Sequence, residues 1–289
     1  MGQIVDGKRI AEGILADLKK RVAVLKKKNI QPALAVIIVG HDQPSHTYVK
    51  KKGEAAEAIG LAFFKYEMPA NTDKDTLISR IKEIQAEHDL SGLILQLPVP
   101  EKLWPSTREI VNHIHIGIDV DCLSHLALGR VMMNESPLLP PTPSAMLEVL
   151  KYHQIDLTGK EVCVVGRGSL IGKPLAAMLN NQPVTLVTCG RSTPDLSVYT
   201  KKADVIFSGV GKKDLITGKM IKAGAIVIDA GVCFDRPFGS SQDKMYGDVD
   251  FESVSKKAAL VTPTPGGVGP ITVAKLLENT VKVAEGGNQ

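Results

Sequence analysis

The chain has 289 residues, of which 44% are hydrophobic, enough apolar material for about two domains with cores of their own. A disordered or fibrous protein is therefore excluded. A net charge of +4 and an aromatic content of 4% argue against nucleic acid binding and favour small-molecule partners.

The first half of the chain alternates amphipathic helices with short aliphatic strands, which is typical of a parallel sheet covered by helices. Apolar residues recur every three or four positions along residues 7–28 and predict an opening helix with one buried face. Helices are also expected at residues 45–60 and in the segment that Thr72 or Asp73 caps. Compact apolar runs closed by Gly or Pro predict buried strands at residues 33–40, 62–69 and 92–100.

A Pro-rich stretch at residues 137–144 interrupts this alternation, and we expect a stiff connector there in which helix cannot propagate. Beyond it the alternation restarts in a doubly wound nucleotide-binding layout. Turn-rich residues 234–249 predict an inserted hairpin or loop. Helices are expected at residues 144–154, 172–182 and 271–285, and strands at residues 161–166, 183–188, 203–210, 225–232 and 259–265.

The fold class that these elements predict is α/β with two domains. Residues 1–143 and 271–289 are expected to form the first domain, because the final helix can pack back on it. Residues 144–270 are expected to form a Rossmann-like, doubly wound domain.

The cysteines and the N-terminal residues indicate the compartment. The four cysteines form no CxxC pair and no zinc spacing, so we expect no metal site and a reducing environment. The first ten residues lack an apolar signal core, and the aliphatic run at residues 33–39 is far shorter than a membrane span. The sequence therefore predicts a soluble cytoplasmic protein without a membrane partner.

Three glycines, Gly166, Gly168 and Gly172, lie between a predicted strand and a predicted helix. Glycines there let the backbone approach a pyrophosphate, and the helix N-terminus offers it free N–H groups. The spacing is one residue longer than the common fingerprint, so the strand-to-helix context supports the prediction more than the spacing does. A tight turn without a ligand is the alternative.

The cofactor is predicted to be NADP rather than NAD. About 20 residues after the glycines, where an acidic residue would bind the ribose hydroxyl, the chain has Arg191 and Ser192 instead. Arg191, with Arg167, suits a 2′-phosphate; the alternative is an ordinary solvated arginine. The turn at residues 208–212 ends another strand and is expected to border the cofactor. The predicted cofactor-binding residues are Gly166, Arg167, Gly168, Ser169, Gly172, Arg191, Ser192, Gly209, Gly211 and Val232.

A hydroxyl, a phenol and an amine share one face of the second predicted helix. Ser45, Tyr48 and Lys52 stand at i, i+3 and i+7, where neighbouring side chains can meet. The alternative, a solvated lysine face with Tyr48 half-buried, is favoured by the pattern alone. Neighbouring ammonium groups could lower the pKa of Lys52 toward a role in proton transfer.

Polar residues in apolar surroundings give further candidates. Gln96 lies inside a predicted strand, where its amide needs a partner or a ligand. Asp119 and Asp121 would point to opposite faces if their segment were extended, so one of them is expected to be structural. Residues 262–270 combine prolines with three glycines and suit a rigid wall against a flat ligand, with simple loop punctuation as the alternative.

Four blocks of sequence together resemble the bifunctional methylenetetrahydrofolate dehydrogenase/cyclohydrolase family, over nearly the whole chain. They are YVKKK (48–52), GLILQLPVP (92–100), GRGSLIGKP (166–174) and PTPGGVGPIT (263–272). They are similar to the family's Y-V/I-x-x-K, GxxVQLPLP, GRSxxVGxP and P-V-P-G-G-V-G-P-M-T. Residues 118–122, 140–144, 227–232 and 246–252 agree more loosely. An ordered set of this kind is highly specific.

The resemblance implies oxidation of 5,10-methylenetetrahydrofolate with NADP, then hydrolysis of the 5,10-methenyl cation to 10-formyltetrahydrofolate. By the same resemblance, Lys52 assists proton transfer and water attack, Tyr48 packs over the folate, Gln96 tunes the lysine and Asp121 holds the pterin. Ser45 is implied to support this network. Gly266, Gly267 and Pro270 are implied to belong to a loop that brings substrate and nicotinamide together. A homodimer formed through the nucleotide-binding domains is also implied.

Two departures from the family pattern bear on these roles. Cys122 follows Asp121 where the family has glycine, and its side chain could force a different backbone or crowd the pterin. Gly168 replaces a serine that helps hold the 2′-phosphate, and Arg191 could compensate. Two alternatives stay open: another NADP-dependent two-domain dehydrogenase, for an amino acid or hydroxy acid, and a catalytically idle nucleotide-binding protein.

Overall fold

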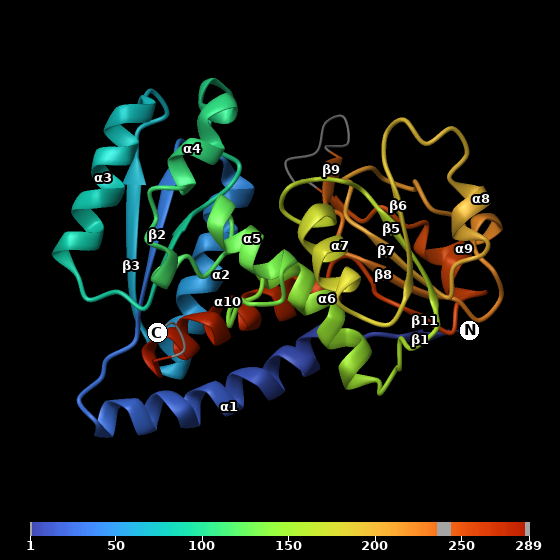
Figure 1. The fold of residues 1–289 in the computed structure, drawn as a ribbon, viewed down its shortest axis with the longest axis horizontal. Helices are drawn as coiled ribbons and strands as arrows, with labels where there is room; N and C mark the ends of the chain where they lie inside the picture. The colour runs from blue at the N-terminus through green and yellow to red at the C-terminus, as the bar shows by residue number, and fades with distance from the viewer. Residues whose placement is uncertain (1, 236–243, 287–289) are drawn as a thin grey trace. The chain divides into compact units, whose positions relative to one another are not determined.

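The computed structural model describes residues 2–235 and 244–286, which form two compact units. We call them the three-stranded unit, built from residues 12–141 and 273–286, and the six-stranded unit, built from residues 2–11 and 142–272. Each has parallel strands and helices, as the sequence predicts (Figure 1). Within the described residues no helix is long and apolar enough to cross a membrane.

The three-stranded unit is a parallel sheet with the strand order β3-β2-β4. Its strands are β2 (Ala33–Val39), β3 (Ala62–Met68) and β4 (Gly92–Leu95). Its helices are α2 (Gln43–Ile59), α3 (Lys74–Glu87), α4 (Thr107–Val111) and α5 (His125–Met132), with the 3₁₀ turns η1 (Glu101–Ser106) and η2 (Ile116–Ile118). Most of α1 (Gly7–Lys27) and of α10 (Val268–Ala284) also belongs to this unit.

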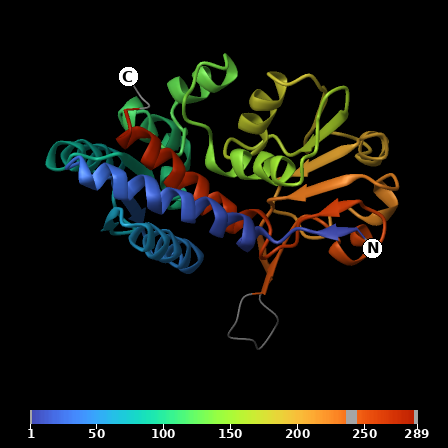
Figure 2. The same cartoon turned by 90° about the horizontal axis from the view of Figure 1, so that it is seen from below.

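Alternate residues of β2 supply two separate cores, because successive side chains of a strand point to opposite faces. Leu34, Val36 and Ile38 share one core with α1, α2 and α10. The residues between them share the other with α3 and α4. Figure 2 shows α1 and α10 side by side, and Leu18 of α1 and Leu277 of α10 belong to the same core. The predicted return of the last helix to the first domain is therefore confirmed.

The six-stranded unit has the strand order β1-β11-β8-β7-β5-β6, with every pair parallel. Its strands are β1 (Gln3–Ile4), β5 (Glu161–Val165), β6 (Thr185–Cys189), β7 (Val205–Ser208), β8 (Ile226–Asp229) and β11 (Leu260–Val261). Its helices are α6 (Pro141–Tyr152), which starts one residue before this unit, α7 (Gly172–Asn180), α8 (Ser197–Thr200) and α9 (Phe251–Ser255), with the 3₁₀ turn η3 (Gly218–Met220). The order reverses between β5 and β7, and such a switch point is where doubly wound sheets bind ligands at the carboxyl ends of their strands.

Several boundaries differ from the prediction. Helix α6 begins at Pro141, inside the stretch expected to exclude helix, because proline is tolerated in a first helical turn. Strand β4 ends at Leu95, before the cis Leu97–Pro98 peptide, so Gln96 lies after the strand rather than inside it. Residues 2–11, predicted with the first domain, belong to the six-stranded unit, because β1 pairs with β11.

The predicted inserted hairpin is only partly visible. Strands β9 (Cys233–Asp235) and β10 (Lys244–Tyr246) pair antiparallel. The intervening residues 236–243 lie outside the described residues, as do residues 287–289 of the predicted first domain.

Candidate active site

The start of α2 orients the predicted catalytic face. Asp42 caps the helix, and its Oδ2 accepts hydrogen bonds from the Ser45 N–H at 2.9 Å and from the Ser45 hydroxyl at 2.6 Å. The Ser45 hydroxyl therefore serves the helix cap. Two turns further on, Lys52 is only 6% exposed, whereas Lys50 and Lys51 face solvent.

The buried Lys52 meets the side chain expected from the sequence. Its Nζ donates to Gln96 Oε1 at 2.9 Å and lies 5.7 Å from the centroid of the Tyr48 ring. Gln96 Nε2 donates in turn to the Leu97 carbonyl at 2.7 Å. The Gln96 main-chain N–H donates to the carbonyl of Ile37 in the central strand, which holds the residue directly after β4. The partner that Gln96 needs is thus the lysine of α2.

Burial controls the charge of this cluster. It lowers the pKa of Lys52, and the nearby negative charge of Asp121 opposes that change. Burial also raises the pKa of Asp121, against the effect of Lys52 and with a further rise from Asp119. The pKa of the Tyr48 phenol is raised mainly by burial. The expectation that neighbouring ammonium groups lower the pKa of Lys52 is wrong, because desolvation is the cause.

The two aspartates after η2 have different surroundings. Asp119 is 1% exposed and accepts hydrogen bonds from the Leu123 and Ser124 N–H groups at 3.2 and 2.9 Å, so it holds the loop before α5. Asp121 is only partly covered. Cys122 adopts a left-handed φ of 53°, the conformation for which glycine is favoured, and its thiol is buried in the core shared by α1, α2 and α10. The backbone therefore keeps a glycine-like turn despite the side chain.

The first glycine turn, residues 166–172, joins β5 to α7 in the six-stranded unit. Gly166 has a φ of 113°. A Cβ on Gly172 would lie 2.0 Å from the Gly166 carbonyl oxygen, so no larger residue fits there. Gly168 and Ser169 are exposed, and a Cβ on Gly168 would meet nothing within 4 Å. A closely packed turn that opens directly into a helix N-terminus fits a dinucleotide pyrophosphate.

The structure brings the segments of the two predicted phosphate-binding arginines together. Arg167 Nη2 donates to the Thr188 carbonyl at 2.6 Å, and a Cβ on Gly190 would lie 3.2 Å from the Arg167 side chain. Arg191 and Ser192 follow directly and are exposed. Arg167 of the first glycine turn is therefore hydrogen-bonded to the end of β6, and Arg191 follows that strand end; two arginines in these segments suit an additional phosphate group.

The other predicted cofactor residues lie at the ends of β7 and β8. A Cβ on Gly166 would lie 2.9 Å from the Gly209 carbonyl oxygen, so the turns after β5 and β7 touch each other. Gly211 has a φ of 79°, and a Cβ added there would lie 3.2 Å from the carbonyl oxygen of Val232. The turn after β7 thus contacts both the turn after β5 and the turn of residues 230–232 after β8, which we call the third turn.

The glycine-rich segment before α10 packs against the start of α1. The Gly7 N–H donates to the Gly266 carbonyl at 3.1 Å, and a Cβ on Gly7 would lie 1.7 Å from the Gly267 carbonyl oxygen. Gly266 is exposed with a φ of 102°, whereas Gly267 is buried. Pro270 lies in the first turn of α10, where proline is tolerated. The backbone of this loop is thus packed closely against Gly7, and its role as a wall for a flat ligand stays a prediction.

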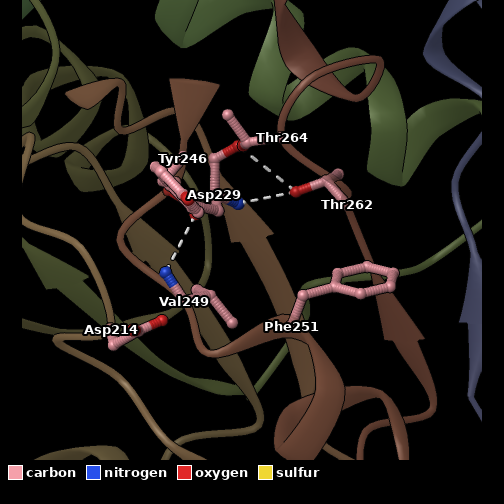
Figure 3. A pocket seen from close by; sticks show the side chains of 8 residues that line it. Asp214, Asp229, Tyr246, Val249, Phe251, Thr262 and Thr264 are labelled. Carbon is pink, nitrogen blue, oxygen red and sulfur yellow. Dashed lines mark hydrogen bonds between the residues drawn. The ribbon is translucent and has the colours of Figure 1, made fainter. Parts of the chain in front are cut away.

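Sequence reasoning did not single out Asp229 and Asp248, two buried carboxylates of the six-stranded unit. Burial and the charge of Asp248 raise the pKa of Asp229 to about 7. Asp229 lines a cavity of about 120 Å³ together with Thr264 and Tyr246. Figure 3 shows the hydrogen bond that the Val249 N–H donates to its carboxylate. One signal in the sequence could have found them: Asp229 and Asp248 are acidic residues within the blocks at 227–232 and 246–252, beside aliphatic residues.

Comparison with known protein families agrees with both units. The model for the catalytic domain of tetrahydrofolate dehydrogenase/cyclohydrolase matches residues 5–121, and the model for its NAD(P)-binding domain matches residues 140–288. The chain belongs to the tetrahydrofolate dehydrogenase/cyclohydrolase family. NADP use is consistent with the NAD(P)-binding domain of this family.

Individual relatives match almost end to end. The bifunctional protein FolD of Nautilia profundicola is 44% identical over 98% of this chain and 97% of its own length. The crystal structure of the bifunctional FolD enzyme from Campylobacter jejuni superposes with a TM-score of 0.92 at 38% identity, covering 99% of each chain. A Trypanosoma brucei FolD structure, complexed with NADP cofactor and inhibitor, gives a TM-score of 0.93 at 34% identity over 98% of this chain and 97% of that one.

Proposed function

We propose that this member of the tetrahydrofolate dehydrogenase/cyclohydrolase family oxidises 5,10-methylenetetrahydrofolate with NADP and hydrolyses the resulting 5,10-methenyl cation to 10-formyltetrahydrofolate. The observation that carries the proposal is the buried Lys52–Gln96 pair, with Tyr48 and Asp121 beside it. An amine whose pKa is lowered by burial gives up its proton more readily than an exposed lysine, which favours a role in general acid–base catalysis.

In the hydrolytic step, neutral Lys52 accepts a proton from the water whose oxygen attacks the methenyl carbon. The added hydroxyl then loses its proton as the formyl C=O forms, the bond from that carbon to one folate nitrogen breaks, and that nitrogen takes up a proton, so the one proton released overall is the one that Lys52 accepted. Gln96 holds the amine by accepting its hydrogen bond at 2.9 Å, so one Nζ proton is committed to the amide. The negative charge of Asp121 keeps the pKa of the lysine from falling as far as burial alone would lower it.

Two further side chains are proposed to bind the folate. The exposed part of Tyr48 offers a flat surface over which the ring system can pack, and the partly covered Asp121 offers a carboxylate to the N–H groups of the pterin. Ser45 contributes by capping α2 and so fixing the helix that carries both Tyr48 and Lys52. Gly266, Gly267 and Pro270 are proposed to form a backbone wall for the substrate.

For the oxidative step, NADP would supply the hydride acceptor when bound, and the hydride would come from the methylene carbon of the folate. The chain's own contribution is alignment, because this step needs no acid or base. The turn of Gly166, Gly168, Ser169 and Gly172 is proposed to bind the pyrophosphate, and the turns of Gly209, Gly211 and Val232 to border the rest of the cofactor. Arg167, Arg191 and Ser192 are proposed to bind the 2′-phosphate.

Both activities can be measured on the same preparation. NADP reduction at 340 nm with methylenetetrahydrofolate tests the oxidation, and the decay of methenyltetrahydrofolate absorbance tests the hydrolysis. Absence of both activities in folded protein would refute the proposal. Turnover of a hydroxy acid or amino acid instead would favour another dehydrogenase, and NADP binding without turnover would favour an idle nucleotide-binding protein.

Substitution of Lys52 separates the two steps. We expect Lys52→Met to reduce hydrolysis by about 100-fold or more, the usual contribution of one acid–base group, and to reduce oxidation much less. Lys51→Met is the matched control, because Lys51 is the exposed neighbour in the same helix. An equal, modest loss of both activities in the Lys52 variant would show that the lysine does not serve water addition.

Cofactor choice is tested at Arg191. We expect Arg191→Ala to raise KM for NADP by about tenfold and to leave KM for NAD nearly unchanged, because only NADP carries the 2′-phosphate. Lys201→Ala removes another exposed cation of the same unit and serves as the control. An unchanged NADP/NAD preference would contradict the assignment.

We also propose a homodimer and a cytoplasmic location. The dimer is what the resemblance to the family implies, and the four free cysteines suit a reducing compartment. Sedimentation velocity across a range of concentrations tests the dimer, which a single species of 31.0 kDa would contradict. Fractionation of the source cells tests the location.

A further inference from the structure

Asp248 is a carboxylate with no exposed surface that accepts four hydrogen bonds from the second glycine turn, residues 208–212. Its Oδ2 accepts from the Ser208 hydroxyl at 2.6 Å and from the Val210 N–H at 2.7 Å. Its Oδ1 accepts from the next two N–H groups along the turn, at 2.8 Å each. A buried carboxylate is tolerated only where donors of this kind satisfy it. The turn is therefore folded around this one side chain.

The second glycine turn is in contact with both of its neighbours. A Cβ on Gly209 would lie 2.7 Å from the Ile171 side chain at the end of the first turn. A Cβ on Gly231, in the third turn, would lie 2.1 Å from the carboxyl carbon of Asp248 itself. A displacement of Asp248 or of the turn it holds would therefore be transmitted to the turns after β5 and β8.

An independent feature of the same turns indicates what they face. Val210 and Val232 are aliphatic, yet each side chain is 46% exposed. The Val210 side chain would contact a Cβ on Gly166 at 3.3 Å, which places it at the first glycine turn. Because Asp248 binds three consecutive N–H groups of the second turn, it fixes which way the Val210 side chain points. Exposed aliphatic groups at strand ends suit the flat face of a heterocyclic ring.

We propose that Asp248 is a positioning residue for NADP: it holds the second glycine turn, and through it the first and third turns, in the conformation that binds the dinucleotide. This inference rests on the proposed function and adds a residue to it. Asp248 acts without touching the cofactor, and its hydrogen bonds to the turn are the means.

The test replaces the carboxylate by its isosteric amide. An asparagine side chain has one acceptor oxygen instead of two, so in Asp248→Asn two of the four donors lose their acceptor and face an NH₂ group. Asp250→Asn is the matched control, because Asp250 lies two residues away and caps α9 instead. Both variants are compared with the wild type for NADP affinity by fluorescence titration, for KM and kcat of the oxidation, and for methenyltetrahydrofolate hydrolysis, which consumes no NADP.

We expect Asp248→Asn to weaken NADP binding by about tenfold or more and to raise KM for NADP accordingly, with hydrolysis within about twofold of the wild type. The Asp250 variant should bind NADP normally. Unchanged NADP affinity in a folded Asp248 variant would overturn the inference, as would an equal loss of both activities, since a merely structural role predicts that result. Wild-type protein that fails to bind NADP would overturn the proposed function together with the inference.

A milder variant covers the case in which Asp248→Asn does not fold. Ser208→Ala removes one donor and leaves the carboxylate with three N–H groups. We expect it to weaken NADP binding by about two- to fivefold without affecting hydrolysis. Unchanged NADP affinity in this variant, with Asp248→Asn unfolded, would assign Asp248 to stability alone and overturn the inference.

Discussion

The buried Asp229 should make the stability of the six-stranded unit depend on pH. An aspartate in the unfolded chain titrates near 3.8, whereas burial and the charge of Asp248 raise the pKa of folded Asp229 to about 7. The folded state therefore holds the proton more tightly than the unfolded state. The stability contributed by this group is fully present below about pH 3.8 and is lost as the pH rises through about 7.

The magnitude follows from the two pKa values. Their difference, from 3.8 to about 7, corresponds to about 4 kcal/mol at 1.36 kcal/mol per pH unit. Between about pH 5 and pH 6.5 the unfolded carboxyl is ionised while the folded one is protonated, so the free energy of unfolding should fall by about 1.4 kcal/mol per pH unit from this group. Asp229 is 2% exposed, which leaves little solvent to screen its charge.

Asp229→Asn removes this titration. Urea unfolding of the wild type and the variant, followed by circular dichroism from about pH 5 to pH 8, gives the slope of the free energy of unfolding against pH. Between about pH 5 and pH 6.5 this slope should be less negative in the variant by about 1.4 kcal/mol per pH unit. The slope is compared because the amide also loses an acceptor for the Gly231 and Val249 N–H groups, which changes absolute stability at every pH. Asp195→Asn, at an exposed carboxylate, is the control. Parallel profiles for wild type and the Asp229 variant would refute the reasoning.

Two other substitutions test the backbone of the two units. Gly172→Ala places a Cβ 2.0 Å from the Gly166 carbonyl oxygen, so it should abolish measurable NADP binding in a fluorescence titration while hydrolysis persists. Gly13→Ala is the control, because a Cβ there meets nothing within 4 Å. Normal NADP binding by the Gly172 variant would contradict the expected geometry. Cys122 has a left-handed φ of 53°, which strains alanine but not glycine. In urea unfolding, the free energy of unfolding of Cys122→Gly should therefore exceed that of Cys122→Ala by about 1 kcal/mol. The reverse order would show that the strain is negligible.

Local patterns in the sequence predicted most of the longer elements of secondary structure, because most of these helices and strands carry their own apolar periodicity. The alternation of β2 between two cores is one example. Strand β1 could not be predicted in this way, since two residues have no period and its partner β11 lies at the other end of the chain. The helix within the Pro-rich connector was missed because proline blocks helix interiors but not helix starts.

At the candidate site, the sequence predicted residue types better than their surroundings. It indicated that Gln96 needs a polar partner, but the partner is 44 residues away in the chain and only the fold brings Lys52 to it. The lowered pKa of Lys52 was expected for the wrong reason, because lysine neighbours are visible in a sequence and burial is not. Asp248 was not singled out, since nothing local distinguishes an acidic residue that binds a distant turn from one in solvent.

The side chain of Asn279, in α10, donates to the main-chain carbonyls of Val120 and Leu139 at 2.8 Å each, and so holds the residue directly before Asp121. The order of synthesis on the ribosome gives this contact a consequence. All residues of the six-stranded unit have been made by residue 272, whereas the three-stranded unit lacks part of its core until α10 follows. The six-stranded unit can therefore mature first during translation, and a chain stopped before Asn279 would contain all of that unit but an incomplete core in the three-stranded unit.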